Sequence, residues 1–317
     1  MATEGLIRQL TPGKLTIQTD DHRIVWYIVR DGILTASPSY ALGDRVEVRS
    51  FSEGLAPYIA SLVQRVSPPA SPQPAISTAP PPSPEDAAIT SARTATAKFV
   101  EELPSFQVHR RTARQEKRGR LARWQTLDEV TATLVYRNGS ESYSDIRIGE
   151  EEVKESLNEI DGLHTTREFG QLVVGILDAE KRAVFARPRP VELNGRNAWR
   201  YTFSISRERS KWRLTTPSEQ YFTAYTGALW IDLETSRVLR VEMEARELPK
   251  AFPLDTVEMN VDYSFVKLDS GETFLLPSES EALNCVRGTN LCLKNATLFT
   301  DYVKFEAESK ILFEDVK

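Results

Sequence analysis

The residues with the clearest potential for chemistry are the chain's two cysteines, Cys285 and Cys292, in the segment NCVRGTNLCLKN. A disulfide between them fits the sequence best, because the residues at 287–290 favour a turn that brings the two sulfurs side by side. Closing so short a loop contributes roughly 2 to 3 kcal/mol to stability. The alternative is a pair of buried free thiols. A closed disulfide indicates an oxidising compartment, and it favours a location outside the cytoplasm.

Metal binding and nucleophilic catalysis are the two other uses of these cysteines. A zinc site needs about four ligands, and no histidine lies within about a hundred residues of the pair along the chain, so we expect no metal. A thiol nucleophile needs a base that the fold brings close. The chain offers three histidines for that role, at His22, His109 and His164. A hydrolase or transferase of this kind therefore requires reduced cysteines beside a histidine.

A basic run at 109–123, HRRTARQEKRGRLAR, is the strongest local charge, with seven arginines and lysines against one acidic residue. We interpret it as a β-hairpin that turns near Gly119, whose cations can hold phosphates of lipid head groups or of nucleic acid. The candidate anion-binding residues are Arg110, Arg111, Arg114, Lys117 and Arg118. The competing interpretation, which we favour, is a solvated hairpin that faces the acidic stretch at 150–161.

The common catalytic signatures do not occur in the sequence. GQLVVG at 170–175 has the spacing of a phosphate-binding loop, but Ile176 and Leu177 stand where a lysine and a hydroxyl residue are needed. No Gly-x-Gly-x-x-Gly, Gly-x-Ser-x-Gly or His-Glu-x-x-His pattern is present. We therefore expect a protein without catalytic activity and without a cofactor.

Charge and hydropathy constrain the partners. The formal net charge is −5, and residues 1–66 hold seven basic and seven acidic residues, so we expect no nucleic-acid partner. The longest apolar runs, such as 172–177, are far shorter than the roughly 20 residues of a membrane span, so we expect no transmembrane segment. The first residues, MATEGLIRQL, show no secretory signal. That leaves a cytoplasmic protein or a mature chain whose signal peptide has been removed.

A proline-rich stretch divides the chain. Eight of the 18 prolines lie between Pro68 and Pro84, and proline at this density favours an extended spacer. We therefore expect a linker at 67–88 between a small domain at 1–66 and a larger domain at 89–317.

The small domain is predicted to be a small, highly curved β-sheet. Its short β segments are separated by turn signals such as Pro12-Gly13 and Gly43-Asp44. Trp26 lies in the most apolar of these segments, so we expect it in the core. The pattern LTIQTDDHRIVWYIV followed by LGDRVEV resembles the small oligonucleotide/oligosaccharide-binding-type (OB-type) barrels of bacterial envelope proteins.

Strands also dominate the larger domain. ITSARTATAKFVEELPSF predicts a helix that ends at Pro104, and Asn138-Gly139 is a strong hairpin signal. Apolar and polar residues alternate over 199–206, 239–245 and 257–265, so each of these strands has one buried and one wet face. The predicted fold is mainly β with a few helices: a small N-terminal β-barrel, and a curved antiparallel half-barrel closed by helices.

The order of these elements, with AYTGALWIDLETSRVLRVEMEA among the strands, resembles the lipoprotein-localisation carriers of bacterial envelopes and their uncharacterised relatives. The resemblance spans about 90–315. It is most specific at 227–240, where Gly-x-x-Trp-x-Asp precedes a turn and Val-Leu-Arg. It implies a half-barrel whose concave apolar side, closed by helices, can take acyl chains, and it implies no catalytic residues.

These features together predict a non-catalytic envelope protein that binds an apolar or lipid-like ligand in the half-barrel. The segment REFGQLVVGILDAEK places an apolar stripe on one face of a helix. The expected ligand lining combines this stripe with strand residues: Phe169, Leu172, Val173, Ile176, Leu177, Trp199, Trp230 and Met243. The alternative is a structural or assembly module that binds a protein partner, with the half-barrel filled by its own side chains.

Overall fold

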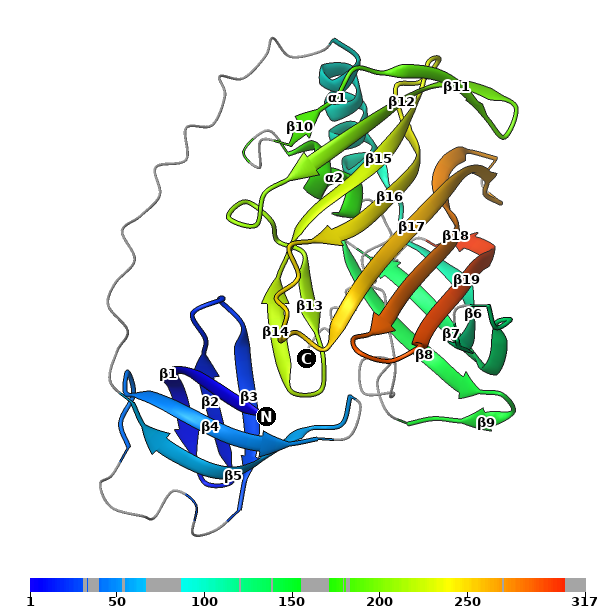
Figure 1. The fold of residues 1–317 in the computed structure, drawn as a ribbon. Coiled ribbons are helices and arrows are strands. Elements are labelled where there is room, and N and C mark those ends of the chain that lie inside the picture. Colours follow the sequence, from blue (N-terminus) through cyan, green and yellow to red (C-terminus); the bar gives the residue numbers. More distant parts are fainter. Residues whose placement is uncertain are drawn as a thin grey trace, which may run out of the picture.

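The computed structural model describes residues 1–30, 33, 40–52, 55–66, 87–119, 121–137, 139–154, 171–178, 180, 183–269 and 271–305. Within these ranges the chain forms two β-sheets and two helices (Figure 1). The mainly β fold predicted from the sequence is confirmed. Nearly all of the expected linker at 67–88 lies outside the described residues, so the division into domains at that linker stays a prediction.

The first five strands close into a small barrel. They are β1 (Ala2–Thr11), β2 (Lys14–Gln18), β3 (Ile24–Val29), β4 (Arg45–Phe51) and β5 (Tyr58–Arg65). Strand β1 pairs with β2 and β4, β3 pairs with β2, and β5 pairs with β4 and, in parallel, with β3. This ring has the strand pairing of an OB-type barrel, the kind that the sequence pattern resembles. Inward-facing Ile17, Val25 and Val48 are fully buried in it.

A hairpin from the larger part of the chain joins this barrel. Strands β13 (Arg213–Thr215) and β14 (Glu219–Phe222) extend the barrel sheet to seven strands, because β14 pairs antiparallel with β3. Between them, the Ser218 carbonyl accepts a hydrogen bond from Trp26 N at 2.8 Å, and its hydroxyl accepts one from Tyr58 N at 2.6 Å. The prediction that Trp26 lies in the core is therefore wrong. It is half-buried, and its Nε1 donates to the Pro217 carbonyl at 2.7 Å.

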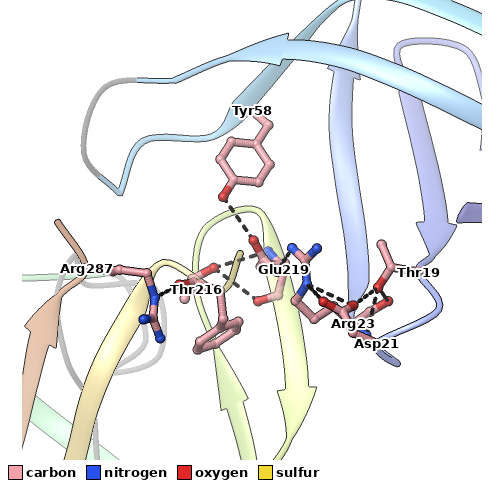
Figure 2. Close-up of polar contacts among 8 residues, drawn as sticks. Thr19, Asp21, Arg23, Tyr58, Thr216, Glu219 and Arg287 are labelled. Atoms are coloured by element: carbon pink, nitrogen blue, oxygen red, sulfur yellow. Dashed lines mark hydrogen bonds and ion pairs between the residues drawn. The ribbon is translucent and has the colours of Figure 1, made fainter. Parts of the chain in front are cut away.

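A buried ion pair fastens the hairpin to the barrel (Figure 2). Arg23 Nη1 donates to Glu219 Oε2 at 2.8 Å, and Tyr58 Oη donates to Glu219 Oε1 at 2.9 Å. Arg23 is 4% exposed and Glu219 is 0% exposed. Arg23 Nε also donates to Asp21 Oδ2 at 3.0 Å.

The pKa shifts of Arg23 and Glu219 point to different strengths for this ion pair. Burial lowers the pKa of Arg23, but the attraction of Glu219 and Asp21 outweighs burial and raises it, as in a strong pair. Burial raises the pKa of Glu219 in spite of Arg23, as in a costly pair. Because Glu219 has no exposed surface, the desolvation of its carboxylate is the larger effect. The bonds that Arg23 and Tyr58 donate to Glu219 offset the cost of burying its carboxylate.

The other strands form one twelve-stranded antiparallel sheet, whose neighbours run β10-β12-β15-β16-β17-β18-β19-β6-β7-β8-β9, with β11 beside β12. The strands are β6 (Phe106–Arg118), β7 (Gln125–Arg137), β8 (Ser140–Ile148), β9 (Glu151–Glu152), β10 (Val184–Phe185), β11 (Arg189–Leu193), β12 (Arg196–Ile205), β15 (Ala224–Asp232), β16 (Val238–Arg246), β17 (Leu254–Lys267), β18 (Thr273–Val286) and β19 (Leu291–Lys304). The sheet is curved and stays open, because its first and last strands do not meet (Figure 1).

Two helices, α1 (Ala87–Glu102) and α2 (Gln171–Leu177), pack on one face of the large sheet, which we call the inner face. The helix predicted before Pro104 is confirmed as α1. Helix α2 lies within the segment whose apolar stripe predicted a second helix. Phe99 of α1 and Ile176 of α2 join one core with Leu229 and Val241 of the sheet. Among the described residues, no helix is long and apolar enough to cross a membrane.

Gly227 of β15 lies where two strands approach closely. A Cβ at this position would lie 1.9 Å from the Glu242 carbonyl oxygen and 2.8 Å from Phe203 Cζ, so neighbouring backbone has to move to admit it. We expect Gly227→Ala to lower the free energy of unfolding by about 1 to 3 kcal/mol, as overpacking usually does. Urea unfolding followed by tryptophan fluorescence measures this change. An unchanged midpoint would mean that β15 and β16 can move apart at this position without loss of stability.

Candidate functional site

The cysteine pair is a disulfide. Cys285 of β18 and Cys292 of β19 are direct cross-strand neighbours with Cα atoms 4.0 Å apart. The predicted turn at 287–290 connects the two strands, and Gly288 takes a φ of 72° there. Neither sulfur is then available as a thiol nucleophile. The cysteine-dependent hydrolase or transferase is excluded in this bonded state.

We expect the bond to stabilise the fold by roughly 2 to 3 kcal/mol. The double variant Cys285→Ala/Cys292→Ala should unfold at a lower urea concentration than the wild type. A reducing agent should shift the wild-type midpoint by a similar amount and leave the double variant unchanged. A wild-type midpoint that does not respond to reduction would contradict the expected contribution.

The inner face is closely packed where the helices cover it. The space between α1, α2 and the sheet has a volume of about 20 Å³ and is lined by residues that include Phe99, Val173, Tyr263 and Leu275. A volume of that size holds about one water molecule. In the described part of the chain, the helix-covered region therefore has no room for an acyl chain unless the helices move.

The structure brings most of the predicted ligand-lining residues together. Val173, Ile176, Leu177 and Met243 are buried in one core, and Leu172 and Trp199 pack against it. Phe169 lies outside the described residues.

Trp230 is buried in the same core cluster, but it lies on a different face of the sheet. It pairs across the sheet with Arg200 and Arg240, whose guanidinium carbons lie 5.0 and 5.7 Å from its ring centroid. Side chains alternate along a strand, so Leu229 and Ile231 face the helices and Trp230 faces the opposite side, which we call the outer face. Trp230 does not face the space beneath α2.

The Gly-x-x-Trp-x-Asp segment has a structural role at each fixed position. Gly227 permits the close approach of β15 and β16, and Trp230 packs between two arginines. Asp232 accepts two hydrogen bonds from Arg196 at 2.9 Å, and it accepts bonds from Thr235 N at 2.9 Å and Thr235 Oγ1 at 2.6 Å in the following turn. Burial works to raise the pKa of Asp232, but the hydrogen bonds from Arg196 and Thr235 outweigh it and lower the pKa.

The basic run is β6 and the turn after it, and most of its cations have partners within their own hairpin. Arg114 pairs with Asp128 at 2.5 Å, Arg118 with Glu116 at 2.8 Å, and Arg111 approaches Glu129 at 3.8 Å. Lys117 Nζ lies 5.1 Å from the centroid of the Trp124 ring. We favoured a solvated hairpin that faces the acidic stretch at 150–161. The ion pairs found here lie within the hairpin and do not involve 150–154, and residues 155–161 lie outside the described residues.

Arg110 differs from the rest of the run. It is 3% exposed, its Nε has no hydrogen-bond partner, and no ion pair is found for it among the described residues. It pairs across the sheet with Phe299 of β19 and Ala132 of β7, and all three side chains face inward. A buried guanidinium without a partner is costly, because burial removes the water that would otherwise solvate it.

Further buried polar side chains lie beside Arg110 on the inner face. Thr112 and Thr297 share a hydrogen bond of 2.9 Å across β6 and β19, and Ser280 pairs with Thr297 in the next strand. Ser280 Oγ is buried without a partner, and so is Asn284 Oδ1, which lies further along β18 at the level of Glu116. We call Arg110 and the three residues near it the polar patch: Arg110, Thr112, Ser280 and Thr297. Of these residues, only Arg110 was predicted from the sequence to bind a ligand. The other residues could have been identified as polar residues at inward-facing positions of strands in which polar and apolar residues alternate.

The outer face carries a hollow of about 780 Å³. Its charged lining residues are Arg200, Arg246, Glu242, Glu244, Glu258 and Glu281. Several are already matched: Arg246 pairs with Glu244 at 2.7 Å, and Lys294 pairs with Glu281 at 3.2 Å. Burial and the neighbouring Glu244 and Glu281 carboxylates raise the pKa of Glu258. Within the ranges described, no group of three or more His, Cys, Asp or Glu residues is placed to hold a metal ion.

Comparisons with known proteins return structural similarity only. No family model matches the chain, and no curated protein matches it. A LolA superfamily protein from Nitrosomonas europaea aligns with a TM-score of 0.32 and 10% identity, over 71% of this chain and 98% of its own. A DUF1329 family protein from Desulfovibrio piger aligns with a TM-score of 0.36 and 8% identity, over 72% of this chain and 98% of its own.

Proposed function

We propose that the protein is a non-catalytic protein of the bacterial cell envelope that binds an apolar or lipid-like ligand on the inner face of its half-barrel. The observation that carries this proposal is the division of that face. One region, beneath α1 and α2, is apolar and includes Leu229 and Val241. The adjoining region holds the polar patch with its unpartnered Arg110. A surface divided in this way complements an amphiphile.

The apolar part of the ligand would lie between the helices and the sheet. Because the space there is about 20 Å³, the helices have to move away from the sheet to admit a chain. Helix α2 has only seven residues. Arg93 Nε of α1 donates a hydrogen bond to the Leu177 carbonyl of α2 at 2.5 Å, which links the two helices. Each methylene group that the ligand buries contributes about 0.8 kcal/mol, so a long acyl chain can offset the cost of opening.

Two features support the location and the lack of catalysis. The Cys285–Cys292 disulfide fits an oxidising compartment such as the periplasm. With both cysteines bonded, the thiol chemistry considered from the sequence has no nucleophile.

The small volume beneath the helices favours a second candidate function. A half-barrel that its own side chains fill suits a structural or assembly module, whose binding surface would be for a protein partner.

Denaturing extraction of the purified full-length protein, followed by mass spectrometry, tests the two candidates. We expect about one lipid per chain and, in the same run, the mass of a closed Cys285–Cys292 bond. A blank purification from the same host without the protein serves as the control. Absence of lipid, together with failure of a fluorescent fatty acid to bind, would overturn the proposal and favour the assembly module.

A further inference from the structure

We propose that the polar patch is a binding site for the anionic head group of an amphiphile, with Arg110 as its central residue. This inference rests on the proposed function, and it adds the charge of the ligand and the direction in which it lies. The ligand class is an acyl chain that ends in a carboxylate or a phosphate.

The burial of Arg110 is the first step. Arginine remains protonated in proteins, so its burial cannot be relieved by loss of the proton. The other arginines of this strand with assigned partners have carboxylates, whereas the described residues supply none to Arg110. An anionic oxygen would remove the cost of the unpaired charge and form charge-assisted hydrogen bonds with the planar guanidinium.

The neighbouring polar atoms are the second step. Ser280 is 4% exposed and its hydroxyl has no partner, so it is free to donate to an oxyanion. The Thr112 and Thr297 hydroxyls lie one inward position beyond Arg110 along β6 and across to β19. Hydroxyl groups beside a guanidinium suit an oxygen-rich anion rather than a second apolar chain.

The position of Arg110 along its strand sets the direction of the ligand. On one side of it along β6, inward-facing Val108 and Phe106 are buried in the core that the helices cover. On the other side, inward-facing Thr112 begins the rest of the polar patch. An amphiphile with its anion at Arg110 therefore extends its chain toward Phe106 and the helices.

Competition binding with the full-length wild type tests this site. We use palmitate, the uncharged hexadecanol and 1-palmitoyl lysophosphatidate as competitors of a bound fluorescent fatty acid. We expect an anionic amphiphile to bind at least about tenfold more tightly than hexadecanol, as a charge-assisted hydrogen bond predicts. Tighter binding of palmitate assigns a carboxylate, and tighter binding of lysophosphatidate assigns a phosphate.

Arg110→Gln should abolish this preference and leave the affinity for hexadecanol unchanged. Arg246→Gln, on the outer face, should keep the wild-type preference. Because Arg110→Gln removes an unpaired buried charge, the ligand-free variant should melt at the same or a higher temperature than the wild type. If Arg110→Gln does not fold, Arg110→Lys, which keeps the charge but loses the planar fork, should weaken the preference.

The outcomes separate the two proposals. Wild-type protein that binds hexadecanol and palmitate equally well would overturn the anion site and leave the apolar ligand in place. An Arg110→Gln protein that keeps its preference for the anion would also overturn the site. Wild-type protein that binds none of the three ligands would overturn the proposed function and the anion site with it.

Discussion

Arg23→Met is expected to lower the free energy of unfolding by about 3 to 5 kcal/mol, because it removes one partner of a buried ion pair and leaves the other charged. Of its side-chain donors, Glu219 would keep only the Tyr58 hydroxyl, in a place with no exposed surface. Urea unfolding, followed by the fluorescence of Trp26 and the other tryptophans, measures the loss. Trp26 is useful here because it contacts the same hairpin.

Two further variants separate the buried charge from the loss of arginine in general. Arg49→Met removes an arginine of the same barrel whose side chain is 61% exposed and whose partner is Glu47, so it should cost less than about 1 kcal/mol. The double variant Arg23→Met/Glu219→Met removes both buried charges and should recover much of the stability that Arg23→Met loses. If Arg23→Met and Arg49→Met have equal effects, the buried pair does not hold the hairpin to the barrel.

The sequence was sufficient for elements whose signals are local. Alternation of apolar and polar residues predicted β12, β16 and β17, because each of these strands has one face against the core. The hairpin between β7 and β8 followed from Asn138-Gly139. The disulfide followed from a turn between two cysteines that become neighbours across a β-hairpin.

Features that depend on distant partners could not be predicted. Arg23 and Glu219 are 196 positions apart, and nothing near either residue indicates the other. Strands β13 and β14 are three and four residues long, too short for a clear alternating pattern, and β14 adds to a sheet formed by the start of the chain. Trp230 was grouped with Met243 by hydrophobicity alone. The pairing of Trp230 with Arg240 places it on the opposite face from α2.

The polar patch illustrates the same limit within the candidate site. Arg110 belonged to a run of cations that sequence alone cannot divide into paired and unpaired members. The ion pairs of Arg114 and Arg118 and the burial of Arg110 make that division. Thr112, Ser280 and Thr297 come from three strands, and only the pairing of β18, β19 and β6 brings them together.

Asp232→Asn is expected to lower the free energy of unfolding by about 3 kcal/mol, near the lower end for a buried pair that loses one partner. Asp232 is 2% exposed and accepts four hydrogen bonds, two from Arg196 and two from Thr235. The amide cannot accept all four, because one of its two oxygen positions becomes a donor. The Arg196 side chain is 31% exposed, so water replaces part of what it loses.

Glu234→Ala is the matched control, because Glu234 binds the same Arg196 at 2.8 Å but its side chain is 79% exposed. We expect a loss of less than about 1 kcal/mol from it. The effect of Asp232→Asn should also depend on pH. Since the folded pKa of Asp232 is lowered, its stabilisation is complete above the unfolded value of about 3.9 and is lost as the pH falls through the folded value. The wild type and Asp232→Asn should therefore converge in stability at acid pH. A difference that stays constant as the pH falls would mean that the charge of Asp232 does not stabilise the turn between β15 and β16.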